Sequence, residues 1–203
     1  MRWNRFFEDL EHQLDSEWEV QQAAVDGETE RLRLSRLDLR TRLMALLGSD
    51  IAVELAGTSG LSGELTAVGA DWIGLTREPG GAALVPLSSV QALRLGREAM
   101  LASIGVGDDH GDAPRTHASL AARQTFGFVL RDLARRRICV VLQRGDERAL
   151  AGTIDRVGVD HLDLALHDRG VPRREGEVSG YRIVPLAAVT WVQLDRQSAQ
   201  LGL

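Results

Sequence analysis

The chain of 203 residues contains no lysine, and all of its 24 basic residues are arginine. This absence excludes the phosphate-binding loop that ends in Gly-Lys-Ser/Thr. No Gly-x-Ser-x-Gly nucleophile elbow, His-Glu-x-x-His zinc motif or dinucleotide-binding glycine fingerprint occurs either. We therefore expect a protein that is not an enzyme, with no cofactor and no small-molecule substrate.

Cysteine and long apolar runs are equally scarce. The single cysteine, Cys139, excludes a disulfide within the chain, and its place in an apolar stretch predicts a buried thiol without chemistry. No apolar run approaches the roughly 18 residues needed to span a bilayer, and the N-terminus lacks an uninterrupted signal-peptide core. These absences predict a cytoplasmic protein without membrane contact.

Metal and acid–base sites have weak support. Asp108, His110 and Asp112, with His117 nearby, form the one cluster whose residue types suit a cation, but it lacks EF-hand spacing and a Cys/His framework. Asp160 and His161 are neighbours along a strand, so alternation sends them to opposite faces. We expect no metal site, and a solvated surface around residues 160–168.

The chain carries one pattern twice, around residues 51–95 and 138–194. Ile51-Ala-Val-Glu-Leu55 recurs as Ile138-Cys-Val-Val-Leu142, and Val85-Pro-Leu-Ser-Ser-Val90 recurs as Val184-Pro-Leu-Ala-Ala-Val189. Between them, Gly63-Glu-Leu-Thr-Ala-Val-Gly69-Ala-Asp71 recurs as Gly152-Thr-Ile-Asp-Arg-Val-Gly158-Val-Asp160. The offset grows from 87 to 89 to 99 residues, so the insertions fall between the blocks. One supersecondary unit is therefore used twice.

Each copy is predicted to form five short strands. Alternation in Ile51, Val53 and Leu55 is typical of a half-buried strand, whereas residues 138–142 are apolar on both faces and should be covered on both sides. Gly69 and Gly158 predict tight turns, and Pro86 and Pro185 mark the junction between the last two strands. The predicted strands are 51–56, 61–69, 71–77, 83–87 and 90–95, then 138–143, 148–158, 160–167, 181–186 and 189–194.

Helices are predicted before each copy. Residues 3–25 form an acidic amphipathic helix with apolar residues three and four apart, Asp26-Gly27 interrupts it, and a second helix runs from Thr29 to about Leu47. A third spans residues 119–133. The predicted division is an N-terminal helix (1–27), a helix with a small barrel (28–97), a linker (98–118), and a second helix with a small barrel (119–203).

The order of these blocks resembles the Sm-like small barrel, and Gly152–Leu164 is similar to the first motif of that family. The layout with its acidic, aromatic N-terminus also resembles an uncharacterised family of high-GC Gram-positive bacteria. The resemblance implies an α+β, mainly β fold of two tandem five-stranded Sm-like or SH3-like barrels. Gly74 and Asp163 stand where the Sm family has a base-reading Asn, and Val-Pro-Leu replaces its cationic element, which argues against ring-type uridine recognition.

Two functions remain open, and neither is catalytic. The first is a protein-interaction or assembly module, with a protein partner or self-association, because an aromatic acidic helix and exposed strand edges both favour protein contacts. Its candidate contact residues are Trp3, Phe6, Phe7, Leu10, Leu14 and Trp18. Whether that helix packs on its own chain or on another, and whether the barrels form a pseudo-dimer or part of a ring, stays open.

The alternative is binding of RNA or single-stranded DNA in a regulatory role. Residues 1–30 carry two arginines against nine acidic residues, whereas residues 115–182 carry thirteen against nine. Arginine neutralises phosphate, and Tyr181 or Trp191 could stack on bases. The candidate contacts are Arg131, Arg135, Arg136, Arg137, Arg144, Arg148, Arg156, Arg173 and Arg174.

Overall fold

The computed structural model describes residues 22, 25–57, 60–78, 81–105, 122–146, 148–170 and 173–194. The chain divides into two compact units, residues 1–41 and residues 42–203. The predicted helix of residues 3–25, with its six aromatic and leucine candidates, lies almost wholly outside the described residues. Its role in protein contacts stays a prediction.

In the first unit, residues 25–35 form one continuous helix, so the predicted interruption at Asp26-Gly27 is wrong. The helix ends instead at Ser35, before α2 (Leu39–Met44). Asp38 is responsible, because its Oδ1 accepts a hydrogen bond at 2.6 Å from the backbone N–H of Thr41. A side-chain oxygen that accepts from the first turn is a helix cap, and it starts a new helix here.

The described part of the second unit contains ten strands, and every predicted strand end lies within one residue of the observed end. The first five are β1 (Asp50–Leu55), β2 (Leu61–Val68), β3 (Trp72–Thr76), β4 (Ala82–Pro86) and β5 (Val90–Arg94). The other five are β6 (Cys139–Arg144), β7 (Ala149–Val157), β8 (His161–Leu166), β9 (Gly180–Pro185) and β10 (Val189–Leu194). Short 3-10 turns follow the two prolines: η1 (Leu87–Ser89) and η3 (Leu186–Ala188).

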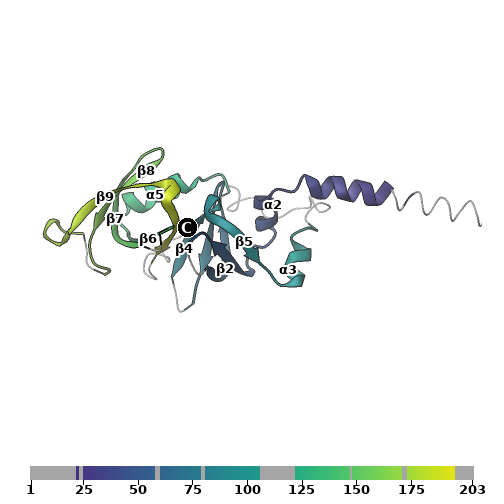
Figure 1. The fold of residues 1–203 in the computed structure, drawn as a ribbon, viewed down its shortest axis with the longest axis horizontal. Helices are drawn as coiled ribbons and strands as arrows, with labels where there is room; N and C mark the ends of the chain where they lie inside the picture. The colour runs from purple at the N-terminus through teal and green to yellow at the C-terminus, as the bar shows by residue number, and fades with distance from the viewer. Residues whose placement is uncertain are drawn as a thin grey trace, which may run out of the picture. The chain divides into compact units, whose positions relative to one another are not determined.

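These strands form one antiparallel sheet in the order β5-β1-β2-β3-β4-β10-β6-β7-β8-β9 (Figure 1). The predicted closure into two separate five-stranded barrels is therefore not observed. The sheet continues from one copy of the repeat into the other, because β4 pairs with β10 and leaves β5 and β9 as its two ends. The fold is α+β and mainly β, as predicted, with few and short helices.

The junction between the two copies is a strand pair. Val192 lies opposite Leu84, Gln193 opposite Ala83, and Leu194 opposite Ala82. The three residues of β4 in this register are buried or half-buried, and Ala83 has no exposed surface at all. The hydroxyl of Ser89 donates across the junction to the carbonyl oxygen of Thr190 at 2.7 Å.

Each copy also places a tryptophan in the core of the other. Trp72 of β3 packs in the cluster formed mainly by α5 and strands β6–β10, whereas Trp191 of β10 packs among residues of β1–β4. The indole N–H of Trp72 donates to the carbonyl oxygen of Gln124 at 2.9 Å, and the guanidinium of Arg77 lies 5.4 Å from the ring centroid of Trp191. Both rings are almost fully buried, so the two cores are interlocked.

The helix before the second copy is α5 (Phe126–Arg135), and it begins seven residues later than predicted. Thr125 fixes its start, because its side chain accepts from the backbone N–H of Phe128. Phe126, Val129, Leu130 and Leu133 form its buried face. Within the predicted linker, a short helix α3 (Arg97–Ala102) is present, and residues 106–121 lie outside the described part of the chain. Helix α5 lies beside β7 (Figure 1).

Two local predictions are confirmed. Val140, Val141 and Leu142 of β6 are buried in succession, so this strand is covered on both faces. A Cβ atom at Gly69 would lie 2.0 Å from the indole nitrogen of Trp72, which makes the glycine of that turn obligatory.

Candidate functional site: the β9 edge and an arginine-lined hollow

The second copy contains a β-bulge that turns two charged residues to one side of the sheet. Strand β7 pairs with β8 so that Ile154 lies opposite Leu164 and Arg156 opposite Asp163, which leaves Asp155 as the extra residue. A bulge bends its strand and re-aims the side chains next to it. Asp155 and Arg156 consequently line the same hollow.

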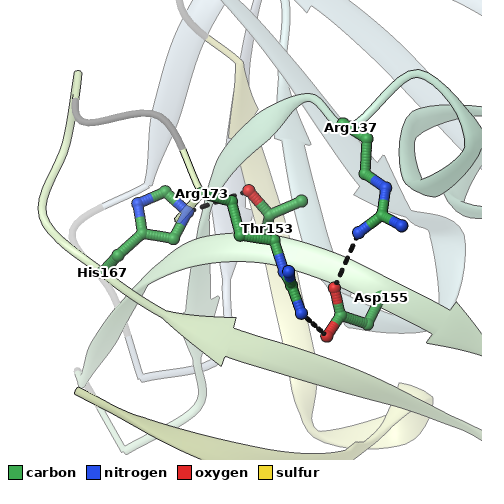
Figure 2. Close-up of polar contacts among 5 residues, drawn as sticks. All are labelled: Arg137, Thr153, Asp155, His167 and Arg173. Atoms are coloured by element: carbon green, nitrogen blue, oxygen red, sulfur yellow. Dashed lines mark hydrogen bonds and ion pairs between the residues drawn. The ribbon is translucent and has the colours of Figure 1, made fainter. Parts of the chain in front are cut away.

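Asp155 holds two arginines that come from different parts of the chain. Its Oδ1 lies 3.3 Å from Nη1 of Arg137 at the end of α5, and its Oδ2 lies 2.7 Å from Nη2 of Arg173 in the loop before β9 (Figure 2). The hydrogen bond that Arg173 donates to Asp155 raises the pKa of Arg173 above its usual value. Nε of Arg173 is buried and has no hydrogen-bond partner within the described ranges.

Arg137 reaches Asp155 from a backbone conformation that favours glycine. Its φ is +56°, the only positive value at a non-glycine among the described residues, and the N–H of Ile138 donates to the carbonyl of Leu133 as in a Schellman helix end. The turn between α2 and β1 in the first copy also contains a residue with positive φ, Gly48 at +81°. A strained residue that carries a charge to a shared ion pair is typical of a functional site.

Two residues before Asp155, Thr153 bonds to His167 (Figure 2). Oγ1 of Thr153 lies 2.8 Å from Nε2 of His167, and Nδ1 of His167 lies 3.0 Å from the carbonyl oxygen of Asp168. A carbonyl oxygen only accepts, so Nδ1 carries the proton, and Nε2 of the neutral ring accepts from the threonine hydroxyl. Both side chains are buried, so the expected solvated surface around residues 160–168 is wrong at His167. The pair stabilises the sheet and presents no nucleophile to solvent.

The hollow beside the bulge has a volume of about 670 Å³, within the range of ligand sites. Strand β9 forms one wall, and two of its side chains there are the exposed Tyr181 and Ile183. Four arginines and two aspartates supply the remaining lining: Arg137, Arg156, Arg173, Arg182, Asp155 and Asp163. A smaller hollow of about 340 Å³ shares Arg137, Asp155 and Arg156 with it and adds Arg131 and Arg135 from α5.

The nine nominated arginines are thus divided. Five of them line the two hollows: Arg131, Arg135, Arg137, Arg156 and Arg173. Four others lie elsewhere: Arg136, Arg144, Arg148 and Arg174.

Aspartates neutralise most of the nominated arginines locally. Asp132 forms ion pairs with Arg135 and Arg136, and Asp146 lies 2.9 Å from Arg144 and 4.0 Å from Arg148. These are surface pairs, and each contributes little to stability. They also lower the charge that remains for an anionic partner.

Sequence reasoning did not nominate Asp155, Arg182 or Ile183. A position-by-position comparison of the two copies would have shown the signal, because Thr66, Ala83 and Leu84 occupy the matching places in the first copy. Of the two aromatic residues nominated for stacking, Trp191 is buried in the core and cannot stack on a base, whereas Tyr181 is 62% exposed.

The metal-like cluster of Asp108 to His117 lies outside the described residues, and within the described ranges no group of three metal-binding side chains gathers. No helix in the described part of the chain is long and apolar enough to cross a membrane. Comparison with known proteins found no protein-family model and no curated protein that matches the chain.

Proposed function

We propose that this chain is a non-catalytic binding and assembly protein that takes up an extended segment of another protein along the free edge of β9. The observation that carries the proposal is the internal junction. Strand β4 binds β10 along one edge, and β9, its counterpart in the second copy, has no strand on that side among the described residues. An unpaired edge offers a row of backbone donors and acceptors to an added strand.

The strand order supports a finer description of the fold. The first copy has the order β5-β1-β2-β3-β4, and the second has β10-β6-β7-β8-β9. Since β10 is the counterpart of β5, the two orders are the same. We propose that the copies are two Sm-like units that share a continuous sheet. The fourth strand of the first unit, β4, pairs with the fifth strand of the second unit, β10.

The side chains of β9 also support binding to a protein. Ile183 is 74% exposed, whereas Leu84 at the matching position of the junction is 1% exposed. Tyr181 lies on the same strand and is also exposed. Exposed aromatic and branched apolar residues on an edge strand are costly to leave in water unless a partner covers them.

A direct test is photo-crosslinking from the edge. A benzophenone amino acid at position 183 should give a discrete crosslinked protein in cells, and the bound segment can be mapped by mass spectrometry. The matched control is the same probe at Leu101 on α3. This residue is 59% exposed, and its helix follows β5, the strand at the other end of the sheet from β9. Equal crosslinking from both positions, or none from position 183, would contradict the proposal.

RNA or single-stranded DNA is a second candidate ligand, supported by the hollow. Arg156 and Arg182 have no ion-pair partner within the described ranges, and Tyr181 next to them could stack on a base. Binding of single-stranded RNA should then fall steeply as salt rises, and Arg156→Glu should weaken it. Affinity that does not depend on salt would contradict this candidate.

A further inference from the structure

The edge of β9 is the counterpart of the β4 edge, but its side chains differ. The last two strands of the two copies align at a constant offset of 99 residues, with identical residues at Val85 and Val184 and at Pro86 and Pro185. Two of the three residues of β4 that face β10 are replaced by larger residues, Ala82 by Tyr181 and Ala83 by the charged Arg182, whereas Leu84 is replaced by its isomer in Ile183.

The same offset predicts how a second copy of this chain would pair with β9. Strand β5 is the counterpart of β10 and forms the opposite end of the sheet. In the register of the internal junction, Leu93 would lie opposite Ile183 and Arg94 opposite Arg182. The backbones would match, whereas the charges would not.

Two arginines directly opposite each other on paired strands repel and destabilise the pairing. The internal junction has no such conflict, because Gln193 lies opposite Ala83 at that position. The polar contacts of the junction are lost as well. Ser89, which donates to the carbonyl of Thr190, is replaced by Ala188 in the second copy. The surface around β9 is therefore not built to receive this chain's own β5.

The charge beside β9 indicates what would fit instead. Asp155 is already shared by Arg137 and Arg173, while Arg156 and Arg182 form no ion pair with any other described residue. Both side chains line the hollow that β9 borders, and Nη1 of Arg182 also donates to the backbone carbonyl oxygen of Tyr181 at 2.8 Å. A strand paired with β9 would bring one of its side chains opposite Arg182.

We infer that the β9 edge selects an acidic extended peptide segment, with a carboxylate opposite Arg182, and rejects a second copy of this chain through Arg94. The inference rests on the proposed function, because it names the partner of the same edge. It adds a specificity residue on each side: Arg182 attracts the partner, and Arg94 prevents head-to-tail growth. Placing a repulsive pair against one competitor is a common route to specificity.

Peptides of this chain's own β5 provide the probe. Three synthetic peptides would cover residues 88–97 and carry Arg, Gln or Glu at position 94, and binding to the full chain would be measured by fluorescence anisotropy. We expect affinity in the order Glu, Gln, Arg, with about a 3- to 30-fold range between Glu and Arg from one cross-strand charge pair. The difference in affinity between the Glu and Arg peptides should become smaller as the salt concentration rises.

A charge reversal in the protein is the control. Arg182 is exposed, so Arg182→Glu should fold normally and should reverse the order of the three peptides. Arg174→Glu, an exposed arginine that lines neither hollow, should leave the order unchanged.

Four outcomes would overturn the inference. The first is equal affinity for the three peptides, and the second is an order that Arg182→Glu does not change. The third is that single-stranded RNA binds more tightly than the Glu peptide and that Arg182→Glu weakens the binding of RNA as well. This result would assign the surface to nucleic acid. A protein crosslinked from position 183 through a segment without acidic residues would also refute the acidic partner, while the proposed function would stand.

Discussion

The junction of the two copies can be tested by exchanging one residue between β4 and β9. Ala83→Arg places in the junction the residue that β9 carries at position 182. Ala83 has no exposed surface and lies opposite Gln193. An arginine there must either bury its guanidinium without a carboxylate or push β10 away from β4.

The expected cost follows from two effects. Overpacking a filled core costs about 1–3 kcal/mol, and an uncompensated buried charge about 3–5 kcal/mol when no relaxation occurs. Because the chain can relax partly, we expect a loss of about 3–5 kcal/mol in the free energy of unfolding. This is a large share of the roughly 5–15 kcal/mol that stabilises a typical domain.

Urea unfolding, followed by the fluorescence of the buried Trp72 and Trp191, measures this loss. With a slope of about 2 kcal/mol per molar urea, the midpoint should fall by about 1.5–2.5 M. Arg182→Ala on the exposed β9 is the matched control and should shift stability by less than about 0.5 kcal/mol. If Ala83→Arg does not fold, Ala83→Leu should still cost about 1–3 kcal/mol. A loss below about 1 kcal/mol in both Ala83 variants would refute the paired junction.

Four further predictions concern single positions. Arg137→Gly should raise the free energy of unfolding by about 0.5–1 kcal/mol in urea titrations, because relief of the left-handed backbone exceeds the loss of an exposed ion pair; a destabilised variant would contradict this. Thr153→Val should cost about 1–3 kcal/mol, since it leaves Nε2 of the buried His167 without a donor, and thermal unfolding should show a lower Tm. Leu130→Ala should cost about 2–5 kcal/mol in the same assay, because the side chain is fully buried in α5, whereas a cost near zero would argue against the packing of that helix. Strand alternation does not separate Asp160 and His161 as expected, because Asp160 precedes β8, and Nδ1 of His161 lies 2.7 Å from Oδ1 of Asp160. This hydrogen bond lowers the pKa of Asp160, so the stabilising contribution of the carboxylate is present above its unfolded pKa of about 3.9 and is lost as pH falls through the lower folded value. His161→Phe should raise the pKa of Asp160 in an NMR titration, and an unchanged value would disprove that cause.

Much of the local structure could be predicted from sequence because it depends on short-range patterns. The alternation in residues 51–55 and the Val-Pro-Leu elements fix strands and turns within a few neighbours. Helix ends were less predictable. Asp38 and Thr125 begin new helices through single capping hydrogen bonds, and capping competes with equally plausible starts nearby.

The pairing of β4 with β10 could not be predicted from either copy alone. Both copies have nearly the same pattern, so each could form a closed unit or join its neighbour. The candidate site was only partly predictable for a related reason. The arginines were visible as a composition bias, but the ion pairs that gather Arg137 and Arg173 on Asp155 are a tertiary feature. The first copy has the same bulge at Thr66, which carries no carboxylate.

The exchange of Trp72 and Trp191 between the two cores makes the folding of each half depend on the other half. Either half alone would lose one large side chain from its own core and expose the other to water. If the chain were divided between residues 105 and 122 and the halves were expressed together, they should complement each other and restore the native fluorescence. Their joining segment then acts chiefly by raising the effective concentration of one half near the other. Because the two copies are joined in one chain, they always pair with each other. The sequences of the two end strands, β5 and β9, can therefore diverge.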